Sequence, residues 1–418
     1  MARILVIFFM IFNLSFALDL EQAVKLALKN HPFLKQKFSE LRSKRFDYFT
    51  TYGNFIPTLS FDYTYSKYRD TEPDYFSRNY SFSFYWTIYN SGQNILLNRI
   101  KEKLLKSSQN DYSETVLDIK FQIKKAYYTA CANREILRFR KIQLKAAEKN
   151  FQMAEKKLKL GLVKRSDYLQ AKVRLENVRY MLFQAENEYK KSIAHINSLI
   201  GYPLDTQTEI DTSILTQVEK EKIPDFRSIK KTAFHRPIFR QYTYDLEASK
   251  LRSIQSILSF TPSIYISYSI NRDYSTIYGN SQNYNIFRIG LSWTIFEGLK
   301  RYYYYLSSKE DERFYRYRLK ELKRQILLNL YSLYLDLKTS YKNLEVSKTL
   351  LKEAEHNYKQ ALGEYRVGKG DIISLVTAES SLANAHETYV QSLLNIALTK
   401  AILEREMGVE KLTEGEVK

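Results

Sequence analysis

Hydrophobic side chains recur every seven residues along much of the chain, and each recurrence stops at a glycine. In the first half, two rows at this interval share one helical face: Leu144, Phe151 and Leu158, and beside them Ala147, Ala154 and Gly161. Two such rows are the a and d positions of a heptad repeat. A new heptad pattern starts beyond Gly161 and runs to Gly201. The pattern therefore predicts a long helix, a tight turn and a returning helix.

The same arrangement occurs a second time at a constant distance along the chain. Gly161 and Gly368 are 207 residues apart, and so are Gly201 and Gly408. The second copy has its own heptad rows: Leu351, Tyr358 and Tyr365, with Ala354, Ala361 and Gly368. The chain is therefore a tandem duplication. Small residues at four of these positions (Ala147, Ala154, Ala354 and Ala361) favour close, shallow helix packing.

Ahead of each long helix the hydrophobic period changes from about 3.6 residues to 2. Apolar and polar residues alternate in four segments: Leu59–Tyr65, Tyr80–Ile88, Ile264–Ile270 and Phe287–Ile295. Such alternation predicts four strands, each with an apolar and a largely polar face. Amphipathic hairpins over a soluble core would also fit. We favour membrane strands, because strands of about ten residues match the roughly 9–11 that a tilted membrane strand needs, and the apolar rows carry aromatic residues toward their ends.

The apolar row of each strand is the face that we expect to contact lipid. Its members are Phe61, Tyr63, Phe82, Phe84, Trp86, Ile264, Ile266, Ile289, Leu291 and Trp293. Four strands are too few to close a barrel, and an open edge in hydrocarbon leaves unpaired backbone groups. Other copies of the chain must complete the sheet. A dimer would supply about eight strands, too narrow for a channel, whereas a trimer would supply about twelve.

Shorter helical patterns precede both pairs of strands. One runs from Asp19 to about Tyr52 and is interrupted at Pro32, and its counterpart follows Pro237 and reaches about Ser259. His31 stands directly before Pro32, and His235 stands two residues before Pro237. We assign them capping or packing roles, because no other metal-ligating residues cluster with them.

The N-terminus has the pattern of a secretory signal. An apolar run from Ile4 to Phe12 is followed by Ser15 and Ala17 at the small-residue positions of a cleavage site. We therefore expect five segments: a signal peptide over 1–17, a first repeat over 18–201, a connector over 202–226, a second repeat over 227–408 and a C-terminal tail over 409–418. With only 12 Gly and 7 Pro among 418 residues, the chain suits long helices.

The chemistry of the chain gives no support for an enzyme. We find no HExxH motif, no phosphate-binding glycine loop, no pair of Cys and His for nucleophilic catalysis, and no clustered carboxylates beyond the spacing of a helix surface. His195, His356 and His386 are isolated on polar helical stretches, where we expect solvated side chains. Cys131 is the single cysteine and is expected to be a small buried side chain. The net charge of +19 comes from Lys and Arg interspersed with Glu, so we predict solvated helix faces and no nucleic-acid partner, cofactor or metal.

Taken in order, these features resemble the TolC family of outer-membrane factors. The residues that carry the resemblance are FIPTLSF (55–61) with FTPSIYI (260–266), WTIYNSG with WTIFEG, and GLVKRSDYLQA (161–171) with GKGDIISLVTA (368–378). The resemblance covers about Asp19 to Met407. It depends on the ordered, duplicated combination and not on any single motif.

The resemblance implies a mainly α-helical fold with membrane β-structure. Long antiparallel coiled-coil hairpins would form a periplasmic α-barrel, and four strands per protomer would contribute to a twelve-stranded outer-membrane β-barrel in a homotrimer. Such a protein is the passive exit duct of a tripartite efflux or secretion system. A periplasmic adaptor, or membrane fusion protein, joins it to an inner-membrane transporter. The expected location is the outer membrane of a Gram-negative-type cell, extending into the periplasm.

By the same resemblance, the two glycine turns lie at the periplasmic tip, where the adaptor binds and the gate is located. The corresponding residues are Gly161, Leu162, Val163, Asp167, Gly368, Asp371, Ser374 and Thr377. Members of the family often carry acidic residues just after the second tip glycine, and the positions here are Ser374 and Thr377. A cation-selective acidic ring at these positions is therefore not supported.

Three alternatives remain open from the sequence. The same duct could serve type I protein secretion or metal-ion efflux, because the substrate is chosen mainly by the pump. The third is a periplasmic coiled-coil tether without a pore. The four alternating segments disfavour this last alternative, since a tether needs no barrel.

Overall fold

The computed structural model describes residues 17–69, 75–217, 225–277 and 279–409. The predicted signal peptide (1–17) and C-terminal tail (409–418) therefore lie almost entirely outside the described residues.

The chain divides into two compact units, and each unit contains segments from both repeats. The first comprises Met1–Lys35, Thr115–Ala233 and Ile326–Lys418, and we call it the hairpin unit. The second comprises Gln36–Glu114 and Phe234–Gln325, and we call it the sheet unit.

The first helical pattern forms two helices, α1 (Leu20–Asn30) and α2 (Pro32–Thr50), followed by a short 3₁₀ helix η1 (Thr51–Phe55). The carboxylate of Asp19 caps α1 by accepting a hydrogen bond from the backbone N–H of Gln22 at 2.7 Å. The helix ends at Asn30 because Pro32 disfavours helical backbone in the preceding residue and lacks an N–H. The predicted interruption at Pro32 is confirmed.

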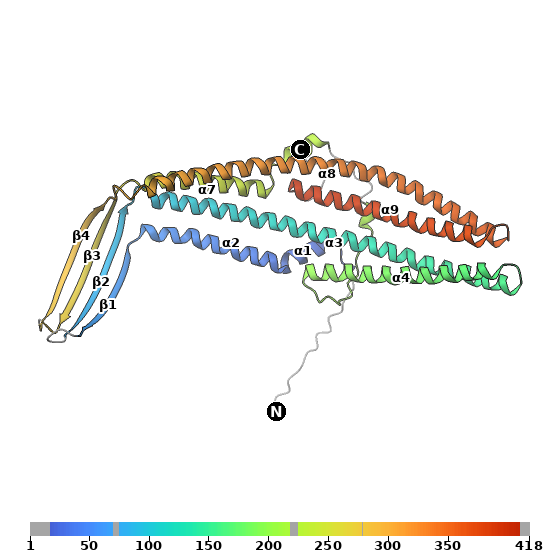
Figure 1. Ribbon diagram of the computed structural model, residues 1–418, viewed down its shortest axis with the longest axis horizontal. Coiled ribbons are helices and arrows are strands. Elements are labelled where there is room, and N and C mark those ends of the chain that lie inside the picture. Colours follow the sequence, from blue (N-terminus) through green and yellow to red (C-terminus); the bar gives the residue numbers. More distant parts are fainter. Residues whose placement is uncertain (1–16, 70–74, 218–224, 278, 410–418) are drawn as a thin grey trace, which may run out of the picture. The chain divides into compact units, whose positions relative to one another are not determined.

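Each repeat contributes one long helix and one returning helix of equal length. The long helices α3 (Gln93–Lys159) and α8 (Lys300–Arg366) have 67 residues each, and the returning helices α4 (Arg165–Ile200) and α9 (Ile372–Met407) have 36 each (Figure 1). At 1.5 Å per residue the long helices extend for about 100 Å. Equal lengths in the two copies follow from the duplication.

The connector between the repeats is less regular than these helices. It contains the short helix α5 (Ile214–Gln217), and α6 (Phe226–Thr232) begins at the last residue of the predicted connector. The helix α7 (Pro237–Leu258) then matches the second predicted run. Among the described residues, no helix combines the length and apolar character needed to cross a membrane.

The four predicted strands form one antiparallel sheet in the sheet unit. They are β1 (Thr58–Tyr68), β2 (Tyr75–Tyr89), β3 (Ser263–Ser275) and β4 (Ser281–Ser292), hydrogen-bonded in the order β1-β2-β3-β4 (Figure 1). Pairing of β2 with β3 joins the hairpins of the two repeats. The mainly helical fold with four strands is confirmed.

One strand ends earlier than the alternation predicts. The last residue pair between β3 and β4 is Ser263 with Ser292, so Trp293 and Ile295 lie beyond the strand. The reason is that β3 begins directly after Pro262, which has no N–H to continue the ladder.

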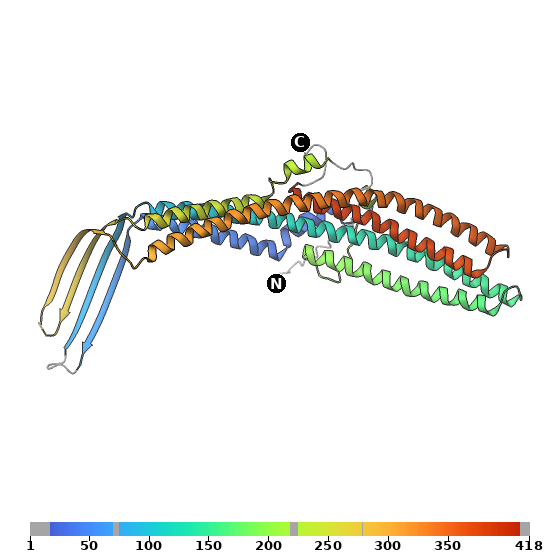
Figure 2. The same ribbon diagram turned by 45° about the horizontal axis from the view of Figure 1, so that its top comes forward.

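In the hairpin unit, the α8–α9 hairpin lies alongside the α3–α4 hairpin in both views (Figures 1 and 2). Its interior is lined by small and aliphatic residues such as Ala147, Leu175 and Val178. Cys131 is fully buried, as expected, and burial raises the pKa of its thiol to about 12.

The expectation of a solvated His386 is wrong. Its ring stacks on Phe139 with a centroid distance of 4.0 Å, and burial lowers its pKa. His386 is next to the buried Ala385 on α9, and the ring of Phe139 on α3 covers the His386 ring. His195 and His356 are exposed, as expected.

Candidate functional site

Both long helices end at the turns in the same hydrogen-bonded motif. Gly161 has a φ of 70° and Gly368 a φ of 77°. At the first turn, the N–H groups of Gly161 and Leu162 donate to the carbonyls of Leu158 and Lys157 at 3.0 and 2.9 Å. This is a Schellman motif, and the second turn repeats it. Glycine is favoured at both positions because a left-handed φ is costly for residues with a Cβ atom.

The returning helices begin with carboxylate caps that differ between the repeats. Asp371 precedes α9, and its Oδ1 accepts from the N–H of Ser374 at 2.7 Å. This hydrogen bond lowers the pKa of Asp371. In the first repeat, Asp167 lies inside α4 and accepts from the backbone N–H of Lys164 at 3.3 Å. Both carboxylates therefore interact with backbone at a helix N-terminus.

A small apolar core lies just inside the turns and joins the two hairpins. Its buried members are Ala154, Ala171, Ala361, Tyr365, Ile372, Leu375 and Ala378. Lys157 of α3 reaches across to α8, where its Nζ donates to the carbonyl of Tyr365 and lies 4.3 Å from the centre of the Tyr365 ring. Since most members of this core are small, the helices approach closely and each contact buries little area.

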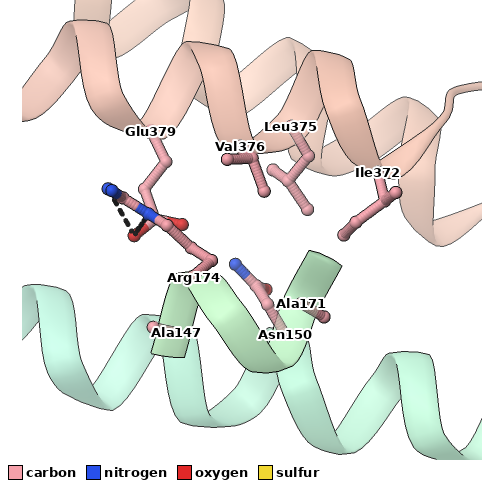
Figure 3. Close-up of a pocket in the computed structure, with 8 residues that line it drawn as sticks. All are labelled: Ala147, Asn150, Ala171, Arg174, Ile372, Leu375, Val376 and Glu379. Atoms are coloured by element: carbon pink, nitrogen blue, oxygen red, sulfur yellow. Dashed lines mark hydrogen bonds and ion pairs between the residues drawn. The ribbon is translucent and has the colours of Figure 1, made fainter. Parts of the chain in front are cut away.

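A buried ion pair lies deeper between the hairpins (Figure 3). Arg174 of α4 donates through Nε and Nη2 to Oε1 of Glu379 on α9, at 3.3 and 3.2 Å. The side chains are 10% and 4% exposed. Burial raises the pKa of Glu379, while the charge of Arg174 opposes that shift. The pair therefore fixes α4 against α9 by a charged contact inside a mainly apolar interface.

The ion pair borders a small cavity that is partly polar. Its volume is about 10 Å³, and Asn150 projects into it beside Arg174 and Glu379 (Figure 3). The Nδ2 atom of Asn150 is buried and has no hydrogen-bond partner among the described residues. The space suits about one water molecule.

Sequence reasoning missed this pair, although a signal was present. Glu379 stands four residues after Leu375 and three before Leu382, on the apolar face of α9. Arg174 likewise follows Ala171 by three residues on the apolar face of α4. A charged residue at an apolar heptad position in each hairpin could have indicated a buried pair.

The predicted tip residues all lie at the turns or in the first two turns of the returning helices. Leu162 is 69% exposed and Val163 is partly exposed. Ser374 and Thr377 are three residues apart on α9, and both are exposed. None of these four belongs to the apolar core between the hairpins.

Apart from Trp293, which lies beyond β4, the predicted lipid-facing residues share one face of the sheet. The pairing register places Phe61 opposite Phe82, Trp86 opposite Ile266, and Ile266 opposite Ile289. Several of these side chains are largely exposed, including Phe61 at 66% and Ile289 at 68%. The opposite face is mostly polar, with Asp62 paired to Ser81.

The two tryptophans hold equivalent places at the base of the sheet. The indole N–H of Trp86 donates to the carbonyl of Phe55 at 3.2 Å, and that of Trp293 donates to the carbonyl of Phe260 at 3.0 Å. Trp293 thus keeps the tertiary contact of its counterpart although it lies outside β4. Among the described residues, no group of three or more His, Cys, Asp or Glu could hold a metal ion.

The fold, a four-stranded antiparallel sheet with two long helical hairpins, is shared with solved structures of outer-membrane channels. The model of the outer membrane efflux protein family matches residues 23–202 and 243–409, and the chain belongs to this family.

Solved structures of similar fold come from several bacteria. The outer membrane protein VceC of Vibrio cholerae has a TM-score of 0.79 at 15% identity, with 93% of this chain and 96% of that chain covered. The CmeC outer membrane channel of Campylobacter jejuni has a TM-score of 0.81 at 15% identity, covering 95% and 87%. A relative found by sequence is Protein CyaE of Bordetella pertussis. It is 20% identical over 401 residues, and the match covers 94% of this chain and 85% of CyaE.

Proposed function

We propose that this protein is a trimeric outer-membrane channel that acts as the passive exit duct of a tripartite efflux or secretion system. The observation that carries the proposal is the sheet, which has an exposed apolar face and two edge strands, β1 and β4, that do not pair with each other in the described structure. Membership in the outer membrane efflux protein family supports it.

The sheet cannot be stable in lipid as a single copy. An unpaired edge in hydrocarbon leaves N–H and C=O groups without partners, at a cost of several kcal/mol each. Pairing β4 of one protomer with β1 of the next removes both edges. Three copies give about twelve strands, enough to surround an aqueous lumen.

The two faces of the sheet then have different environments. The apolar row that contains Phe61, Phe84 and Leu291 contacts lipid, and Trp86 and Trp293 lie at the membrane boundary that adjoins the helices. The polar row that contains Asp62 and Asn271 faces the lumen.

The helices continue the duct into the periplasm, and the glycine turns form its tip. The exposed Leu162, Val367 and Ile373 give this tip an apolar surface suited to a protein contact. We assign the eight tip residues named from the sequence to adaptor contact and gating. The adaptor links the duct to an inner-membrane transporter that supplies the energy.

A periplasmic tether without a pore is the competing function, and the exposed apolar row on the sheet disfavours it. Membrane fractionation followed by light scattering in detergent separates the two. A duct extracts only with detergent and has three times the mass of one chain. An aqueous monomer would instead identify a tether.

A further inference from the structure

Basic side chains outnumber acidic ones around the two hairpin turns. Residues 155–172 and 359–377 contain both turns and the adjoining ends of α3, α4, α8 and α9. In these segments nine side chains are Lys or Arg, and four are Asp or Glu.

All four acidic side chains already have partners. Asp167 and Asp371 accept hydrogen bonds from backbone N–H groups at the starts of α4 and α9. Glu155 forms an ion pair of 3.3 Å with a lysine one turn along α3. Glu364 accepts a hydrogen bond of 3.0 Å from Gln360. The carboxylates are therefore largely occupied by local contacts.

Four basic side chains beside the turns are, in the described part of the chain, not paired with an opposite charge. They are exposed and form no ion pair with any residue of the described ranges: Lys164, Arg165, Arg366 and Lys369. Two come from the turn of each repeat, so in a trimer twelve such charges would surround the tip. The exposed α9 positions that follow the second turn, Ser374 and Thr377, are neutral and do not offset them.

We propose that these four residues make the periplasmic entrance of the duct selective for anionic solutes. The inference depends on the proposed channel and adds its substrate class: small molecules with carboxylate, phosphate or sulfate groups. A ring of one charge sign at a narrow entrance raises the local concentration of counter-ions, by about tenfold or more at low salt. Anions are enriched at this tip, and cations are repelled.

The test is the chloride-to-potassium permeability ratio of purified trimers in planar bilayers under a KCl gradient. The wild-type ratio is expected to exceed one. In the variant K164Q/R165Q/R366Q/K369Q the ratio should fall by about threefold or more. Replacement of the same four residues by Glu should bring it below one. These effects should shrink near 1 M salt, where the Debye length is about 3 Å.

A matched control removes the same number of charges away from the turns. Lys145, Lys190, Lys338 and Lys352 are exposed on the helices of the hairpin unit, and their replacement by Gln should leave the ratio unchanged. An unchanged ratio in the tip variant, or an equal shift in the control, would overturn the proposal. Assembled wild-type trimers that conduct no ions would instead contradict the channel itself.

Discussion

At the scale of single residues, the two left-handed glycines determine how the hairpins turn. A Cβ atom at Gly161 or Gly368 would meet no other atom within 4 Å, so the cost of a substitution comes from backbone conformation alone. For an L-residue that cost is about 1–2 kcal/mol. The turns are therefore sensitive to residue type although they have free space.

We expect Gly161→Val or Gly368→Val to impair export while trimers still assemble, because a β-branched residue disfavours the positive φ of the turn. Asn at the same positions should be tolerated better, since it adopts this conformation more readily. The control is Gly363→Val in α8, where φ is helical and no atom lies within 4 Å. Normal export by both turn variants would show that the turn geometry is not needed.

The buried pair between Arg174 and Glu379 makes a second prediction at this scale. Replacing either residue alone by Met should cost about 3–5 kcal/mol, because the remaining charge is left buried. Replacing both should be close to neutral. The measurement is thermal unfolding of the wild type, both single variants and the double variant in detergent, with circular dichroism as the readout. Additive losses in the double variant would mean that the two side chains do not interact.

The raised pKa of Glu379 also predicts a pH dependence. Between its usual value of 4.5 and its higher value in the folded protein, the folded state binds more protons than the unfolded state. Stability should therefore rise as the pH falls through that interval. The melting temperature of the wild type should increase relative to Glu379→Gln over the same interval. A constant difference would contradict the shift.

At the scale of elements, the sheet has two faces of different character, and each accepts different substitutions. Asp in place of Phe84 or Leu291 should reduce membrane-inserted trimers, because a charge on a lipid-facing strand position is destabilising, although by less for Asp than the roughly 2–4 kcal/mol of Arg or Lys at the midplane. The control is Ser267→Asp, on the polar face of β3. If only the control prevents insertion, the faces have been assigned in reverse. Heat-resistant trimers in the membrane fraction provide the measurement.

Most elements could be predicted from the sequence because their signals are local. Heptad spacing, the glycines at 161 and 368 and the alternation around Phe82 each depend on residues close together in the chain. The apolar heptad positions of Arg174 and Glu379 indicate that each side chain is buried. Their contact with each other, like the stacking of His386 on Phe139, depends on how separate helices meet. The early end of β4 likewise depends on where its partner strand begins.

At the scale of the whole molecule, the two repeats have long and returning helices of equal length but differ in the residues at equivalent positions. Both repeats have helices of 67 and 36 residues. Yet Glu379 corresponds in the first repeat to Lys172, and Arg174 corresponds in the second to Ser381, each 207 residues away. The ion pair between Arg174 and Glu379 therefore has no counterpart at the equivalent positions of the other repeat.

The most direct test of the proposed duct is the single-channel conductance of the purified protein in planar bilayers, with its mass in detergent measured on the same sample. We predict trimers that open discrete and uniform conductance steps, because three sheets would enclose a water-filled lumen. Trimers that insert without conductance, or monomers that remain in water, would contradict the account.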